Sequence, residues 1–305
     1  MPHLDLIPKA EVSSFRKLAI GTWATAYDPT VYGTLTVRME RALEYIEAFR
    51  QRTGKRLTVT HLVTKAVAEA LHRCPDANAI LRWNRIYLRE KVTLSVLVVQ
   101  PAESGDGAGA KVDLTAAKIE DADKKSLFQI AQEMEDTIDR VRRRKDKALE
   151  QGKSTVQQIP FLLMNLFLKA LSFVMYTLNL DLSKFGMPKD AFGGATITNV
   201  GSLGLDVAYV PLVPYTRVPI FVAPGAVKDA PVVEDGKVVV GKVMHVNASF
   251  DHRFIDGYHA SVLSTTLREM MENPFERFDR IESLPDARKD TPVDLPVTVP
   301  AAGNG

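Results

Sequence analysis

Cysteine is almost absent from this chain of 305 residues, which contains only Cys74. A single cysteine excludes an internal disulfide and a zinc site built from several thiolates, and it is typical of a reducing compartment. The chain also lacks a large charge of either sign, because 39 basic and 37 acidic residues leave a formal net charge of +2. So small a net charge gives no general preference for nucleic acid, and we expect no nucleic-acid partner.

The N-terminal residues lack the basic start and the continuous apolar core of a secretory signal. We therefore expect a cytoplasmic protein. One apolar stretch, residues 159–182, leaves open a peripheral association with a membrane surface. Hydrophobic residues make up 46% of the chain, enough to bury a substantial core.

Helix and strand patterns are mixed without a regular βαβ repeat, which predicts an α+β domain. Apolar residues recur at helical spacing in four segments, at about 40–52, 58–74, 121–149 and 258–272. Gly54 and Pro75 are expected to end the first two helices, and Thr58 or Thr60 to cap the second. Asp121 and Asp123 are expected to open the third.

Strand patterns cover 31–39, 195–201, 217–225 and 242–250. Residues 79–99 are expected to form a hairpin in which 86–88 pair with 92–99. Three units are predicted: an arm over 1–14, a domain over 15–283 with an extra apolar helical insertion at about 141–190, and a disordered tail over 284–305.

The sharpest local feature is the segment FDHRFIDG at 250–257. A histidine after a buried strand, followed by a glycine-bearing turn into a helix, can present its ring to a cleft. Imidazole accepts and returns a proton near neutral pH, so His252 is a candidate general base. The same pattern also suits a histidine that is simply packed or exposed.

The second feature is the segment GGATITNVG at 193–201. Thr196 and Thr198 share one face of the predicted strand, because alternate residues point the same way. Either hydroxyl can donate a hydrogen bond to a developing oxyanion, as an acyl-transfer transition state requires. An ordinary threonine-rich strand would show the same pattern.

Together the segments resemble the catalytic domain of dihydrolipoyl acyltransferases, the core of 2-oxo-acid dehydrogenase complexes, which shares the fold of chloramphenicol acetyltransferase. The matching stretches occur in collinear order: FRKLAI (15–20), GKRLTVTHLVTKAVAEAL (54–71), CPDANA (74–79), EDADKKSLFQIAQEM (120–134), ATITNVGSLG (195–204) and ASFDHRFIDG (248–257). The resemblance implies an α+β fold with a mixed sheet flanked by helices, assembled as homotrimers or trimer-based cages.

The resemblance also implies roles for individual residues. His252 is expected to act as the base, Thr198 as the oxyanion donor from a neighbouring subunit, and Asp256 as an organiser of the catalytic loop. Arg16 matches a basic residue that can pair with Asp256, and the supporting residues are Asn199 and Gly257. Acyl-CoA is the implied substrate, with no metal and no covalent lipoyl group.

Three departures from the family bear on the acceptor. The sequence shows no lipoyl domain, peripheral-subunit-binding domain or linker, so we expect the acceptor to come in trans or to be a different one. The loop PAESGDGAGAKVDL at 101–114 differs from the channel-lining segment of the family. The insertion carries a polar stripe on an apolar helix, at Asn165, Lys169, Ser172, Tyr176 and Asn179, after a basic run.

The insertion has three alternative interpretations: packing within the oligomer, contact with an anionic membrane surface, and a membrane span. The activity also has alternatives to acyl transfer from CoA to a thiol, amine or hydroxyl. These are a non-catalytic oligomeric scaffold and a membrane-recruited acyltransferase acting on a lipid-like substrate. Phe275 or Phe278 matches the apolar residue that bridges trimers in the family.

Overall fold

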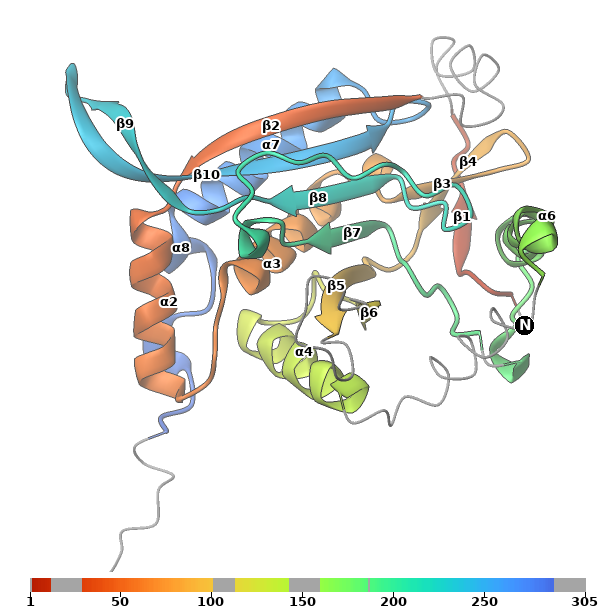
Figure 1. Cartoon of the computed structure of the whole chain (residues 1–305), viewed down its shortest axis with the longest axis horizontal. Helices are drawn as coiled ribbons and strands as arrows, with labels where there is room; N and C mark the ends of the chain where they lie inside the picture. Colours follow the sequence, from red (N-terminus) through yellow and green to blue (C-terminus); the bar gives the residue numbers. More distant parts are fainter. Residues whose placement is uncertain (1, 12–28, 101–112, 143–159, 186, 288–305) are drawn as a thin grey trace, which may run out of the picture.

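A mixed β-sheet forms the centre of the protein in the computed structural model, which describes residues 2–11, 29–100, 113–142, 160–185 and 187–287 (Figure 1). The strand order is β2-β10-β8-β7-β5-β6, and β9 pairs with β10 beyond this path. The pairs β5–β7 and β7–β8 are parallel and the others are antiparallel. The bounds are β2 (Thr30–Arg38), β5 (Leu94–Gln100), β6 (Asp113–Ile119), β7 (Ala195–Thr198), β8 (Ile220–Pro224), β9 (Lys228–Glu234) and β10 (Lys237–Asp251).

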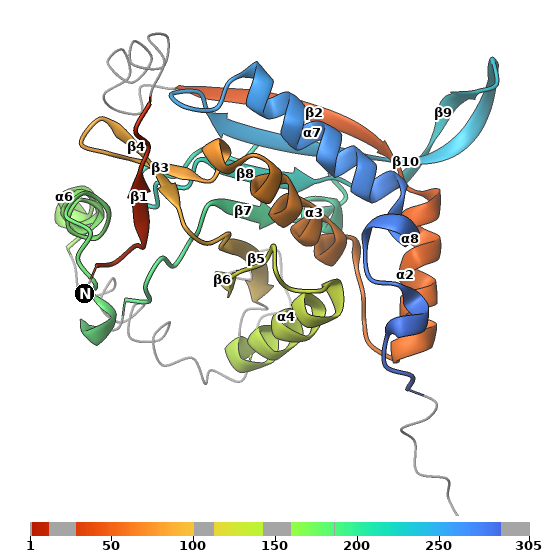
Figure 2. The ribbon, with the colours of Figure 1, turned by 180° about the vertical axis from the view of Figure 1, so that it is seen from behind.

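Helices cover one face of this sheet, as the view from behind shows (Figure 2). Buried aliphatic residues of the helices and strands interdigitate there and form the main hydrophobic core. The predicted α+β class is therefore confirmed. The helices are α2 (Glu40–Thr53), α3 (Val59–Arg73), α4 (Leu127–Arg142), α6 (Phe161–Ser172), α7 (Gly257–Glu272) and α8 (Pro274–Arg277), with short turns η1 (Pro75–Ala77), η2 (Phe173–Thr177), η3 (Ser183–Phe185), η4 (Gly201–Leu203) and η5 (Ile281–Ser283).

The predicted ends of α2 and α3 are confirmed. Gly54 follows α2 with φ 65°, a left-handed conformation that glycine adopts without steric cost. Thr58 is the N-cap of α3, and it forms a capping box with His61, whose Nδ1 accepts from the Thr58 amide at 3.0 Å. The helix stops at Arg73, directly before Cys74 and Pro75.

The buried His61 makes the stability of the protein depend on pH. Burial is the largest cause that lowers the pKa of His61 from 6.5 to about 4, and Arg56 lowers it further. The unfolded chain therefore binds a proton that the folded chain does not bind. The free energy of unfolding is unaffected above pH 6.5 and declines as the pH falls from 6.5 to about 4, by a total on the order of 3 kcal/mol.

We expect His61→Gln to reduce this acid sensitivity. Glutamine keeps a side-chain acceptor for the capping box but does not titrate. Urea unfolding near neutral pH and at about pH 5 should show a smaller loss of stability in the variant than in the parent. An equal loss in both proteins would exclude His61 as the source.

The predicted pairing of 86–88 with 92–99 is wrong. The hairpin instead joins β3 (Ala79–Arg82) to β4 (Arg85–Arg89), and β1 (Leu6–Pro8) extends it to a three-stranded sheet. Trp83 and Asn84 form the turn with φ values of 53° and 57°, as a tight hairpin with the right-handed strand twist demands. A tryptophan in this conformation is uncommon, so the sequence carried little signal for the turn.

The predicted start of the helix at 121 is also wrong, since α4 begins at Leu127. The preceding residues 113–119 form strand β6, paired with β5 along its length. Asp121 lies in the turn between β6 and α4 with φ 47°. Its carboxylate pairs with Lys91 and Lys124, each at 3.2 Å. Residues 143–149 lie outside the described part of the chain.

The structure describes only part of the expected N-terminal arm (1–14) and of the expected disordered tail (284–305). Residues 6–8 of the expected arm pair with β4. Within the expected tail, Leu284 is buried and the amide of Ala287 donates to the Arg52 carbonyl at 3.0 Å, so 284–287 pack against α2. Residues 288–305 lie outside the described residues.

Candidate active site

His252 lies in a tight turn between β10 and α7 that is anchored from both sides. Phe254 and Ile255 are buried in the core, and the Ile255 amide donates to the Asp251 carbonyl at 3.0 Å. The Asp251 carboxylate accepts from the Arg253 amide and guanidinium, at 3.1 and 2.9 Å. These contacts hold the half-exposed His252 in one place at the end of the sheet.

The tautomer of His252 follows from its hydrogen bond. Nδ1 lies 2.7 Å from the Ile255 carbonyl oxygen, which can only accept. Neutral imidazole therefore carries its proton on Nδ1, and Nε2 carries the lone pair. This is the tautomer that a general base needs, with Nε2 as the basic nitrogen.

Asp256 is the N-cap of α7. Its carboxylate accepts from the amides of Tyr258 and His259, at 3.0 and 3.3 Å, and lies 2.6 Å from His259 Nδ1. Asp256 thus caps α7, and its role in catalysis stays a prediction. Gly257 opens the helix with nothing within 4 Å of where a Cβ would stand, so no steric limit requires glycine there.

Thr198 is the last residue of β7 and is half-buried. The other candidate hydroxyl, Thr196, is buried and lies 2.7 Å from Ser95 Oγ, so the structure separates two residues that the sequence left equivalent. Asn199 follows and joins the turn to α3, because its Nδ2 donates to Thr60 Oγ1 at 2.8 Å. Ser95 was missed, although a lone hydroxyl in an apolar strand is a signal for a buried hydrogen bond.

Thr198 and His252 lie toward opposite ends of the sheet in a single chain. Strand pairing places Ile197 beside Val222, so Thr198 is level with Ala223, which pairs with Asn247. His252 is five residues beyond Asn247 on a strand that runs the other way (Figure 1). Five residues of extended chain correspond to roughly 16 Å, and two inter-strand spacings add to the separation. One chain therefore does not bring these two side chains together.

The two faces of the sheet differ in chemistry. The face away from the helices carries Thr198, Thr196 and a network in which Thr34 Oγ1 donates to Asn247 Oδ1 at 2.9 Å and lies 2.6 Å from Tyr209 Oη. This network was missed, because Tyr209 lies in a loop without a recognisable pattern. Hydroxyls and amides gathered on one face suit contact with a polar substrate or a partner.

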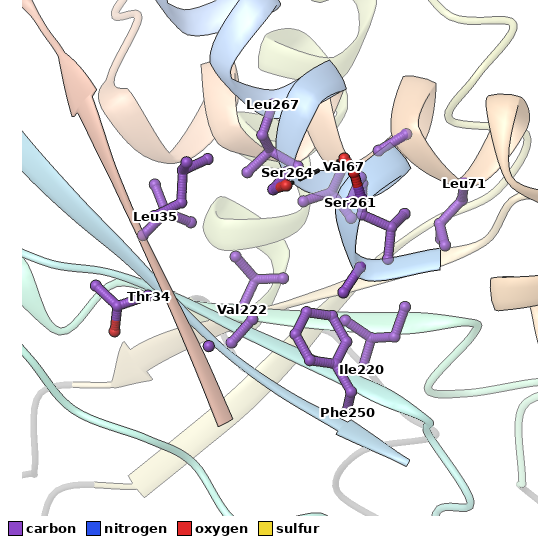
Figure 3. A pocket seen from close by; sticks show the side chains of 16 residues that line it. Thr34, Leu35, Val67, Leu71, Ile220, Val222, Phe250, Ser261, Ser264 and Leu267 are labelled. Atoms are coloured by element: carbon purple, nitrogen blue, oxygen red, sulfur yellow. Dashed lines mark hydrogen bonds between the residues drawn. The ribbon is translucent and has the colours of Figure 1, made fainter. Parts of the chain in front are cut away.

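The helix-covered face contains an apolar cavity of about 300 Å³ between the sheet and helices α3 and α7 (Figure 3). Its lining includes Phe250, two residues before His252, and Ala260 from the first turn of α7. Ser261 and Ser264 are polar members, and Ser264 Oγ donates to the Ser261 carbonyl at 3.1 Å. Because no titratable side chain is among its described lining residues, the cavity itself cannot perform acid–base chemistry.

Arg16 and two further histidines, His72 and His245, have side chains of the types that catalysis or metal binding uses. Arg16 is not among the described residues. His72 pairs with Asp123 at 3.2 Å, and His245 Nδ1 lies 3.0 Å from Thr36 Oγ1. Across the described segments, no cluster of histidine, cysteine and acidic side chains has the geometry for a metal ion.

The model of the 2-oxoacid dehydrogenases acyltransferase catalytic domain matches residues 10–158 and 187–278. The succinyltransferase component of the 2-oxoglutarate dehydrogenase complex from Haemophilus influenzae is 24% identical over 230 residues, which cover 75% of this chain and 44% of that protein. The acetyltransferase component of the pyruvate dehydrogenase complex from Rhizobium meliloti is 27% identical over 229 residues, covering 73% and 39%. The chain thus spans less than half the length of these relatives.

Solved structures show the same fold. The probable dihydrolipoamide acetyltransferase from Listeria monocytogenes has a TM-score of 0.57 at 18% identity, covering 87% of this chain and 94% of that chain. The cubic core of a pyruvate dehydrogenase multienzyme complex has a TM-score of 0.57 at 19% identity, covering 88% and 99%. The fold and family predicted from the sequence are confirmed. This chain therefore belongs to the 2-oxoacid dehydrogenase acyltransferase family and contains its catalytic domain.

Proposed function

We propose that the protein transfers an acyl group between coenzyme A and a thiol acceptor by direct attack on a thioester. The observation that carries the proposal is the His252 tautomer, with Nδ1 donating to the Ile255 carbonyl and the lone pair on Nε2. The family supports the acyltransferase class. A thiol of the dihydrolipoyl type is the favoured acceptor, because the relatives are dihydrolipoyllysine-residue acyltransferases.

The reaction needs one base and one oxyanion donor. Nε2 of His252 takes the proton of the attacking thiol, and the resulting thiolate adds to the thioester carbonyl. The partner subunit's Thr198 donates a hydrogen bond to the tetrahedral oxyanion. The intermediate then expels the other sulfur as a thiolate, which takes the proton back from the imidazolium.

The spacing between two residues studied in a structural relative supports these roles. The structure of the Azotobacter vinelandii dihydrolipoamide acetyltransferase, at TM-score 0.57 and 20% identity, accompanies work on a serine, a histidine and an asparagine in its catalytic mechanism. The histidine and asparagine are four residues apart there, as are His252 and Asp256 here. Threonine in place of serine keeps the hydroxyl donor, and aspartate keeps an acceptor for the cap of α7.

The separation of His252 and Thr198 within one chain supports an active site that is shared between subunits. The turn after Thr198 presents apolar side chains to solvent in the single chain, among them Leu203, which is 67% exposed, with Leu205 and Val207. An exposed apolar stretch of this kind marks an interaction site. A second copy that covers it would bring its own His252 turn toward Thr198, and cyclic repetition would close a trimer.

Leu203→Asp is expected to break this assembly and the activity together. The side chain makes few contacts within the subunit, so thermal stability of the monomer should change little. Burying a carboxylate in an apolar interface is costly, so the particle mass should fall to that of one chain. Mass photometry with a parallel activity assay measures both. A trimer that persists in the variant would place the interface elsewhere.

The acyl-transfer proposal is tested with the purified chain, a panel of acyl-CoA thioesters and free dihydrolipoamide. Transfer is followed by release of the CoA thiol and by formation of acyl-dihydrolipoamide. A chain that assembles but transfers no acyl group to dihydrolipoamide, to an amine or to an alcohol would be the scaffold instead. We infer a cytoplasmic site of action, which the buried free thiol of Cys74 supports.

A further inference from the structure

The segment 159–186 is the internal part of the chain that the family model leaves unmatched. Its described residues include α6 and the turn η2 beside the small sheet, and then the short turn η3 (Figures 1 and 2). The helix is shorter than the sequence pattern predicted, because regular α-helix ends at Ser172. This segment is therefore an addition to the family's domain, and its surface needs an explanation of its own.

The polar stripe of this segment points inward at its C-terminal half. Ser172 is buried and its Oγ accepts from Arg217 Nε at 3.1 Å. Tyr176 is buried beside His3, with ring centroids 5.4 Å apart. Asn179 holds the residues just before β1, since its Nδ2 donates to the Leu4 carbonyl at 2.8 Å. The polar side chains thus fasten the segment to the protein.

Apolar side chains consequently point outward. Leu166 is 66% exposed, and Leu163, Phe173 and Leu178 are exposed as well. Trp83, at the tip of the β3–β4 hairpin, is 59% exposed and meets Phe173 edge-on, with centroids 5.9 Å apart. We call these five residues the α6 face. Several large apolar side chains exposed on neighbouring segments mark an interaction site.

The two segments that carry the α6 face have charges of one sign. Residues 79–89 and 160–180 contain no aspartate or glutamate. Lys169 and Arg85 are exposed cations of these two segments, and half-buried Arg82 is held against η2 by hydrogen bonds from its guanidinium to the carbonyls of Thr177 and Leu178, at 2.6 and 3.5 Å. Asp181, the first acidic residue after residues 160–180, accepts from the Ser183 amide. An apolar surface with a cationic border is complementary to a layer of anionic lipid.

We infer that the α6 face docks on an anionic lipid bilayer, with its leucines and aromatic rings at the level of the headgroups. Tryptophan favours that boundary, and arginine and lysine pair with lipid phosphates while their stems stay apolar. A second copy that used the same face would set like charges against each other. Within the described residues no helix is long and apolar enough to cross a bilayer. The inference rests on this surface alone and is independent of the acyl-transfer proposal.

Flotation of the full chain with vesicles tests this inference. Vesicles of phosphatidylcholine with phosphatidylglycerol should carry the protein at low salt, and pure phosphatidylcholine should carry far less. Added salt should weaken binding, because it screens the cationic border. The double variant Leu163→Glu/Leu166→Glu should lower the bound fraction at least about tenfold, given the transfer free energy of two leucines.

The matched control is Val238→Glu/Val240→Glu on the β9–β10 hairpin, where both valines are more than 70% exposed. The control should bind vesicles as the parent does. Failure of the parent to float with anionic vesicles, or equal loss in both variants, would overturn the inference. A fall in particle mass in the α6-face variant alone would also overturn the inference, because the α6 face would then bind a second copy of the chain and not a bilayer.

Discussion

His252→Ala should lower the rate of acyl transfer by about 10²–10⁴, the usual effect of losing a general base. The variant should fold normally, since the ring is half-exposed and the turn is held by Asp251, Arg253 and Ile255. The loss should fall on kcat, because the proton is removed in the chemical step. Single-turnover transfer from acyl-CoA measures that step directly.

The control for this change is His259→Gln, which alters a histidine seven residues away that pairs with Asp256. A glutamine at N3 preserves the capping box, so transfer should stay within a few-fold of the parent. If His252→Ala kept full activity, direct proton abstraction by this imidazole would be excluded. If both variants lost activity equally, the effect would belong to the loop and not to the base.

Thr198→Ala should lower the rate by about 10²–10³, the usual cost of one oxyanion donor. Thr198→Ser should retain most of the activity, because the hydroxyl is kept. The matched change is Thr196→Val, two residues earlier on the same face of β7. It breaks the hydrogen bond to Ser95 and should affect stability more than rate. If activity survived in Thr198→Ala but not in Thr196→Val, the oxyanion donor would be Thr196 and the assignment to Thr198 would be wrong.

Mixing the two inactive variants tests whether the site is shared. In a mixed trimer, the Thr198→Ala subunit supplies an intact His252 and the His252→Ala subunit supplies an intact Thr198. Where the two meet in the right order, the site is complete. Random exchange around a cyclic trimer leaves about one site in four complete. Activity should therefore reappear on refolding the two variants together. No recovery in demonstrably mixed trimers would mean that both groups act from the same chain.

Local sequence was enough to predict the elements that depend on local contacts. The periodic apolar residues of α2, α3 and α7, with Gly54, Thr58 and Pro75 at their boundaries, each have a cause within a few residues. The same holds for the His252 turn, where a buried strand, two buried anchors and a capping aspartate follow one another directly. Candidate residues of the site could be named for this reason, but not their arrangement.

The sequence did not allow us to predict which strands pair or which faces of the helices are exposed. The hairpin partner of β4 was predicted wrongly, because apolar strands of similar composition pair equally well until a turn such as Trp83-Asn84 selects one register. The start of α4 was predicted wrongly as well, since the residues before it form strand β6 and a turn. The direction of the polar stripe in the insertion was equally open. It depends on Arg217 and Leu4, which lie far from it in the chain.

By itself, the sequence determined the α+β class, the family motifs and the two residue types that acid–base and oxyanion chemistry require. Only the tertiary structure decided that Thr196 bonds to Ser95 while Thr198 remains at the strand end, and that His252 lies toward the other end of the sheet. It also decided that α6 presents leucines to the outside. The physical reason is the same in each case: a side chain's chemistry is local, whereas its neighbours are set by contacts between distant segments.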